Sequence, residues 1–206
     1  MRHRSSWLLA LATAAALNAP AHAQPTAQGR AAACVWAAAP AEIRARLIAA
    51  APATRQMSAA ITNALTLQTA KACDIPPTQD GAQLIAYALM SNAMEIGAQA
   101  KLKTGYAIDR ERLAAAWDHV PAYARLSLST VMRPPRRLTP GAMASLRATA
   151  GALELRDPRA VELLFTYMVG RAIRERLGRD DLESWWRRPG APTPGHSRRH
   201  PGPRGC

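Results

Sequence analysis

The amino-acid sequence predicts an all-α protein: a compact single-domain bundle of about seven or eight helical segments, left after a signal peptide is removed. Hydrophobic residues make up 49% of the chain but aromatic residues only 5%, and alanine and leucine are abundant. Alanine and leucine are strong helix formers, whereas strands favour aromatic and β-branched residues. Prolines and helix-capping residues recur at intervals of about one helix length. The composition and the spacing of prolines and capping residues therefore both favour helices.

The N-terminus has the three parts of a secretory signal peptide. Arg2 and Arg4 are followed by an apolar run over 7–17, and an Ala-His-Ala tripeptide ends at Ala23. This arrangement is typical of a leader for the general secretory route, cut between Ala23 and Gln24. The apolar run is too short to span a bilayer, which needs about 20 apolar residues. We therefore expect a periplasmic or secreted protein that matures where disulfides persist.

The chain divides into a leader and three further parts. Removing the first 23 of the 206 residues leaves 183, which suits one domain with its own hydrophobic core. Residues 24–33 are short, polar and alanine-rich and are expected to form a flexible N-terminal segment. The helical domain is expected over 34–188. Residues 189–206 are rich in proline, glycine and arginine, and this composition predicts a disordered basic tail.

The domain is predicted to begin with two helices separated by a proline. Pro40 suits the first turn of a helix over 40–51, and Pro52 ends that helix. Thr54 is placed to cap the next helix, over 55–72. Apolar side chains recur at helical spacing through both segments: Ile43, Leu47, Ile48, Met57, Ile61 and Leu65. These two segments are expected to form an antiparallel hairpin.

The longest helix is predicted to start at Thr78 or Asp80 and to run to about Lys103. Between 82 and 100 its only charged residue is Glu95, so we expect the buried central helix of a bundle. A membrane span is the alternative, but its polar side chains would each need a partner in lipid. We therefore predict no transmembrane span in the mature chain. Four residues share one stripe that we expect to face solvent: Asn92, Glu95, Gln99 and Lys103.

Each of the remaining predicted helices starts at a capping residue or a proline. They are predicted over 110–119 after Asp109, over 121–132, from Pro140 after Thr139, and over 158–177 after Asp157. A short last helix is predicted to open with Asp180, Asp181 and Glu183 and to end at Trp185 and Trp186. Gly178 is expected in the left-handed conformation that follows a helix end.

The cysteines suggest one structural disulfide. Cys34 precedes the first predicted helix and Cys73 follows the second. If those helices form a hairpin, their outer ends meet, and a Cys34–Cys73 bond would hold them together. Cys206 lies at the end of the predicted tail, and its role is left open.

No pattern in the chain predicts a metal or a cofactor. The sequence holds no C-x-x-C, H-E-x-x-H or acidic calcium-loop motif. Glu95 and His119 are weak acid–base candidates, Glu95 because an apolar helix raises the pKa of a carboxyl group. Asp118 adjoins His119, but neighbours on a helix do not face each other, so Asp118 is not expected to orient the imidazole. The sequence leans against an enzyme.

A basic, tryptophan-containing segment ends the domain and is the predicted contact region. Tryptophan with arginine recurs at membrane interfaces and at interaction hot spots. The net charge of +13 is carried mostly by arginine, which the codon bias of a GC-rich genome explains, and an exported protein does not meet DNA, so nucleic acid is not expected. The contact residues are Trp185, Trp186, Arg187 and Arg188. Alternatively, these indoles cap the core and the arginines merely begin the tail.

These observations lead to one hypothesis with two alternatives. The first is an exported helical binding protein, stabilised by one disulfide, whose partner is an anionic envelope surface or an envelope protein. The second is an envelope hydrolase that uses Glu95 or His119. The third is a helical carrier of a small apolar ligand, held in a cavity between helices.

Overall fold

The fold consists of packed helices, as the sequence predicts. The computed structural model describes residues 26–132 and 137–179, and within these ranges the regular elements are nine helices and no strands. In chain order they are α1 (Ala27–Ala38), α2 (Ala41–Ala50), α3 (Thr54–Ala60), α4 (Asn63–Ala72), α5 (Gln79–Tyr106), α6 (Arg110–Asp118), α7 (Ala122–Thr130), α8 (Pro140–Ala152) and α9 (Pro158–Arg179).

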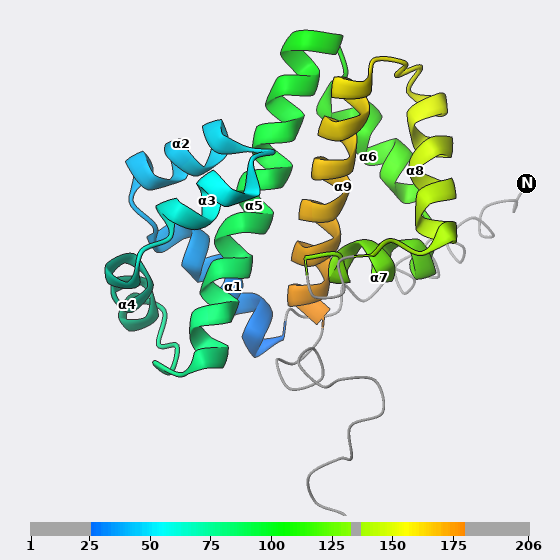
Figure 1. Ribbon diagram of the computed structural model, residues 1–206. Coiled ribbons are helices and arrows are strands. Elements are labelled where there is room, and N and C mark those ends of the chain that lie inside the picture. The colour runs from blue at the N-terminus through cyan, green and yellow to red at the C-terminus, as the bar shows by residue number, and fades with distance from the viewer. Residues whose placement is uncertain (1–25, 133–136, 180–206) are drawn as a thin grey trace, which may run out of the picture.

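Helices α5 and α9 form the centre of the bundle and run antiparallel (Figure 1). The first four helices pack against α5, whereas α7 and α8 pack against α9. Their backbones approach closely at Gly170, where a Cβ atom would lie 2.7 Å from both Glu95 N and Ser91 O. The pair is also joined at one end, where Tyr106 Oη donates to Asp157 Oδ2 over 2.7 Å. The other helices are therefore arranged on either side of a closely packed two-helix centre.

Helix α5 is the buried central helix that the sequence predicts. Thr78 caps it, with Oγ1 accepting a hydrogen bond from Gly81 N over 3.2 Å. The helix ends at Tyr106, where Ala107 adopts a left-handed conformation. Among the described helices, none combines enough length with enough apolar character to span a lipid bilayer.

The predicted solvent-facing stripe on α5 is wrong at its centre. Glu95 is only 8% exposed, whereas its neighbours Ile96 and Ala100 are exposed. The reason is that α9 packs over this face, where Arg174 supplies an ionic partner for the carboxylate. The polar residues at helical spacing on α5 therefore do not all face solvent, since Glu95 is buried among them.

The segment predicted as one helix over 55–72 is two helices, α3 and α4. The chain breaks at Ile61, and Thr62 caps α4 with Oγ1 accepting from Leu65 N over 3.2 Å. In a continuous helix that N–H would bond to the carbonyl of Ile61. Thr54, which was predicted to cap the segment, is the first residue of α3.

Two predictions near the ends of the domain are also wrong. The N-terminal segment expected to be flexible contains the start of α1, which Thr26 caps by accepting from Gly29 N over 3.0 Å. Thr26 Oγ1 also donates to Gly178 O, and α1 packs against α4, α5 and α9. Gly178 does not end a helix, since α9 continues to Arg179. Tertiary packing orders both segments.

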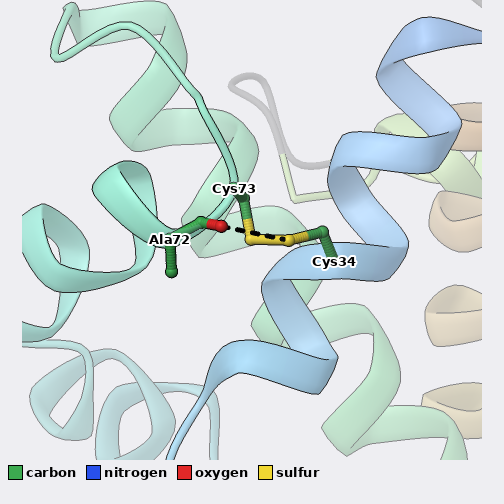
Figure 2. The surroundings of a disulfide bond; sticks show 3 residues. All are labelled: Cys34, Ala72 and Cys73. Carbon is green, nitrogen blue, oxygen red and sulfur yellow. Dashed lines mark hydrogen bonds between the residues drawn. A yellow bond between two sulfur atoms is a disulfide. The ribbon is translucent and has the colours of Figure 1, made fainter.

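The predicted disulfide is confirmed, although it joins different elements from those expected. Cys34 lies within α1 and Cys73 is the C-cap of α4, with a Cα–Cα distance of 5.7 Å (Figure 2). The carbonyl oxygen of Ala72 lies 3.9 Å from Cys34 Sγ. The bond thus holds α1 against the end of α4 instead of closing a hairpin of two helices.

Several predictions lie outside the described residues. They are the signal peptide over 1–23 with its cleavage between Ala23 and Gln24, the short helix from Asp180, the contact residues Trp185, Trp186, Arg187 and Arg188, the tail over 189–206, and Cys206.

Candidate functional site

Glu95, the stronger acid–base candidate, is held in an ion pair between the two central helices. Arg174 Nη2 donates to Glu95 Oε1 over 2.8 Å, and Arg174 Nε lies 2.7 Å from Oε2. Desolvation by burial raises the pKa of Glu95, while the positive charges of Arg174 and Arg171 act to lower it. The predicted raised pKa is confirmed in direction. The contacts, however, make Glu95 an anchor between α5 and α9.

His119, the other candidate, lies elsewhere in the bundle. It is the exposed C-cap of α6, and its Nδ1 is 2.8 Å from Ala115 O. His119 lines a groove beside α7, whereas Glu95 lines neither of the two grooves described below. The structure therefore does not bring the two weak acid–base candidates into one site at α7.

A tryptophan packed between arginines fixes the position of α7. Trp117 is buried, and its Nε1 donates to Glu175 Oε1 of α9 over 2.7 Å. The guanidinium carbons of Arg125 and Arg171 lie 4.9 Å and 5.7 Å from the centre of the indole ring, within the range of cation–π attraction. Side chains of α6, α7 and α9 therefore meet at one polar cluster.

Arg125 also closes the carbonyl end of α6. Its Nε donates to Val120 O over 2.8 Å, and its Nη2 donates to Trp117 O and Asp118 O over 2.9 Å and 3.2 Å. Carbonyl groups at a helix end lack partners within the helix, and the planar fork of a guanidinium can serve several of them at once. The corner between α6 and α7 is thus held by one side chain.

With this corner fixed, α7 presents two large apolar side chains to solvent. Tyr123 is 59% exposed and Leu126 is 57% exposed. They are three residues apart, so they share one face of the helix. The Tyr123 ring lies against α8 at Gly141, where a Cβ atom would be 2.6 Å from ring atom Cε2. We call these two exposed side chains the α7 ridge.

A groove of about 550 Å³ lies on one side of the ridge, among α6, α7 and α8. We call it the apolar groove, since most of its lining is small or apolar: Ala116, Val120, Pro121, Ala144, Ala148 and Ala152. Its polar lining residues are His119, Tyr123, Ser145 and Thr149. An apolar surface with a few converging polar groups is the usual make-up of a small-ligand site.

A second groove, of about 510 Å³, lies between α7 and α9. We call it the arginine groove because Arg125, Arg176 and Arg179 line it. Apolar and small side chains complete the lining: Val120, Ala122, Leu126, Ser129 and Ala172. Leu126 of the α7 ridge therefore forms part of this groove, as Tyr123 forms part of the other.

The α7 face was missed in the sequence because its signal is weak. Ala124 and Leu128 face the core, while Tyr123 and Leu126 face solvent, so large apolar residues occur on two faces of a nine-residue helix. That double pattern is the sequence feature that could have indicated an exposed apolar surface.

Neither a metal cluster nor a known relative points to a reaction. Across 26–132 and 137–179, no three histidine, cysteine, aspartate or glutamate side chains gather in a way that could hold a metal ion. Comparison with protein-family models, curated proteins and solved structures finds no match for this chain. Function therefore has to be inferred from the α7 face itself.

Proposed function

We propose that this chain is an exported helical binding protein, stabilised by one disulfide, that holds a partner against its α7 face instead of catalysing a reaction. The observation that carries this proposal is the exposure of Tyr123 and Leu126 between two grooves. Isolated apolar side chains on a surface are common, but apolar side chains that gather beside a concave surface are typical of interaction sites. The segment over 185–188 is proposed as a second contact region.

Export is the first half of the proposal. It is supported by the leader-like N-terminus and by the Cys34–Cys73 bond, since structural disulfides persist mainly outside the cytoplasm. Intact-mass analysis of protein purified from the periplasm or the culture fluid tests it. We expect a chain that begins at Gln24. A chain that retains Met1 and is recovered only from the cytosol would contradict export.

Binding is favoured over hydrolysis by the placement of the acid–base candidates. Glu95 is paired with Arg174 between the central helices. His119 lines the apolar groove but bonds through Nδ1 to a backbone carbonyl oxygen. Acid–base hydrolysis usually needs a second titratable group close to the first, and no carboxylate of the described residues lines the apolar groove beside His119. The envelope hydrolase is accordingly the less supported alternative.

A carrier of a small apolar ligand is the second candidate function. The apolar groove, at about 550 Å³, falls within the range of about 300–1,000 Å³ that small-molecule sites occupy. A carrier and a partner-binding protein would use the same wall of α8 in different ways. The carrier would enclose a free molecule, whereas the binding protein would accept side chains of another chain.

Site-specific photo-crosslinking in the envelope fraction tests the α7 face as a partner surface. A benzophenone amino acid is placed at Tyr123 in one variant and at Leu67 in the control. Leu67 is 61% exposed on α4 and so matches Tyr123 in accessibility. We expect a discrete protein adduct from position 123 and none from position 67. Identical adduct patterns from the two positions, or no adduct from position 123, would overturn the partner surface.

A neutral fluorescent probe, N-phenyl-1-naphthylamine, tests the carrier. Ala148 is exposed on α8 in the wall of the apolar groove, so Ala148→Trp fills the groove without crowding the core. Ala100→Trp, at an exposed position of α5, is the matched control. Saturable probe binding that only Ala148→Trp removes, together with no adduct from position 123, assigns the carrier function.

A further inference from the structure

The apolar groove holds a buried hydroxyl group without a partner. Ser145 lines this groove from α8 and is only 8% exposed. The one side-chain hydrogen bond at this residue ends on its backbone carbonyl oxygen, to which Thr149 Oγ1 donates over 2.8 Å. Ser145 Oγ itself has no hydrogen-bond partner within 26–132 or 137–179. Burying a hydroxyl group without a partner is costly, so this side chain indicates a ligand that supplies one.

Thr149 complements Ser145 on the same wall of the groove. It lines the groove one helical turn further along and is equally buried, and Cβ atoms at this spacing lie about 5–6 Å apart. Because Thr149 Oγ1 gives its proton to Ser145 O, its free lone pairs can only accept. Ser145 thus has a proton to donate and Thr149 can receive one. A ligand hydroxyl group, which both accepts and donates, satisfies the two side chains at once.

The wall beside this pair is flat and apolar. Ala144, Ala148 and Ala152 are four residues apart and form an exposed row of methyl groups along α8. Pro121 and the ring of Tyr123 line the same groove. No branched side chain interrupts the alanine row, so a planar molecule can lie along it, and aromatic rings pack favourably against one another at such an edge.

We propose that the apolar groove binds a free small phenol: a planar aromatic ring system that carries a neutral hydroxyl group. The hydroxyl group would accept from Ser145 Oγ and donate to Thr149 Oγ1, while the rings would lie against the alanine row. This inference rests on the carrier function, the second candidate above, and adds the class of ligand to it.

His119 supplies a further acceptor at the α6 side of the groove. Its Nδ1 lies 2.8 Å from Ala115 O, and because a carbonyl oxygen can only accept, Nδ1 carries the proton of the neutral imidazole. Nε2 is then left as an acceptor. The groove therefore favours ligands that donate a hydrogen bond over ligands that only accept, such as ethers and ketones.

Equilibrium dialysis with four bicyclic probes tests the hydroxyl group and the ring. The probes are 1-naphthol, naphthalene, 1-methoxynaphthalene and decahydro-1-naphthol. We expect one molecule of 1-naphthol per chain, with a dissociation constant at least about tenfold lower than that of each other probe. Equal affinity for naphthalene or 1-methoxynaphthalene would overturn the hydroxyl site. Equal affinity for decahydro-1-naphthol, whose rings are not planar, would overturn the aromatic class.

Two serine variants locate the hydroxyl group of the ligand. Ser145→Ala removes the donor, and Ser91→Ala is the matched control, since Ser91 is a buried serine on α5 that lines neither groove. We expect Ser145→Ala to weaken 1-naphthol binding about fivefold or more and to leave naphthalene binding unchanged. Ser91→Ala should leave both unchanged, and circular dichroism melting verifies that both proteins remain folded. Undiminished 1-naphthol binding by Ser145→Ala would overturn the proposal.

A third variant tests the acceptor. Thr149→Val keeps the shape of the side chain but removes its oxygen. We expect it to weaken the binding of 1-naphthol and not that of 1-methoxynaphthalene, which has no proton to donate. Equal effects on these two probes would overturn the role of Thr149 as the acceptor.

This inference and the carrier function fail in different ways. Equal binding of all four probes that Ala148→Trp removes would leave a carrier and overturn the phenol site. No binding of any probe would overturn both. A partner's tyrosine side chain carries the same chemical group, so N-acetyltyrosinamide is tested as well. If it binds as tightly as 1-naphthol, the free ligand is overturned in favour of a partner protein.

Discussion

Glu95 and Arg174 form an ion pair that joins the two central helices, with Arg174 Nε 2.7 Å from Glu95 Oε2. The two partners differ in exposure, since the Arg174 side chain is 49% exposed while Glu95 is buried. Although Arg174 Nε lies close to Glu95 Oε2, this oxygen accepts no well-directed hydrogen bond from the described residues. The carboxylate is therefore desolvated and only partly compensated, which agrees with its raised pKa.

This relationship predicts a pH-dependent stability. Folding raises the pKa of Glu95 above its ordinary value of 4.5, because burial disfavours the charged form. The folded protein thus holds this proton more tightly than the unfolded chain. The contribution of Glu95 to the free energy of unfolding is most favourable below pH 4.5 and declines as the pH rises through the raised pKa.

Replacing Arg174 by methionine should increase this pH dependence. Arg174→Met leaves a buried carboxylate without its nearest counter-charge, so we expect the free energy of unfolding at pH 7 to fall by about 1–3 kcal/mol. The loss should shrink toward acidic pH as Glu95 takes up a proton. Urea unfolding at several pH values measures it. In a Glu95→Gln background Arg174→Met should show no such trend, and a loss independent of pH would refute the explanation.

A second prediction concerns the close approach of α5 and α9 at Gly170. Gly170→Ala places a methyl group 2.7 Å from backbone atoms of Glu95 and Ser91, which cannot move without shifting α5. We expect a loss of about 1–3 kcal/mol in the free energy of unfolding. The matched control is Gly151→Ala in α8, where a Cβ would have no neighbour within 4 Å.

The control should change stability in the opposite direction. Alanine stabilises a helix interior by about 0.5–1 kcal/mol relative to glycine, and Gly151, in the last turn of α8, offers part of that gain with no steric cost. Thermal melting of the two variants compares them directly. Similar melting temperatures for Gly170→Ala and Gly151→Ala would mean that the two helices can separate easily, contrary to this packing.

The third prediction concerns the disulfide between Cys34 and Cys73. The two residues are 39 positions apart, and closing a loop of this size in the unfolded chain corresponds to about 4 kcal/mol in the chain-entropy model. The double variant Cys34→Ser with Cys73→Ser should therefore lose roughly this much stability in urea unfolding. The unsubstituted protein in reductant should unfold at the same urea concentration as the double variant. An unchanged midpoint on reduction would refute the contribution.

Local chemistry explains which features could be predicted from the sequence. Thr78, Asp109 and Thr139 were recognised as helix starts, and each accepts a hydrogen bond from the backbone N–H three residues later. Such caps depend on neighbouring residues alone. The pairing of Cys34 with Cys73 was predicted correctly, although the element that contains Cys34 was not.

Other features depended on contacts between residues far apart in the chain. The α1 helix carries no apolar pattern strong enough to predict it, and it is held by packing against α4, α5 and α9. Glu95 was expected to face solvent because its spacing matches other polar residues. Only the position of α9, 79 residues further along at Arg174, made that face an interior one.

The sequence by itself determined that the described chain is helical, where most of its helices begin, and which two cysteines pair. These depend on composition, on caps within three residues and on the small number of cysteines. The tertiary structure alone decided that Glu95 is buried, that Tyr123 and Leu126 are exposed, and that two grooves flank α7. Burial and concave shape arise from how helices pack, and that packing is set by contacts that no local pattern encodes.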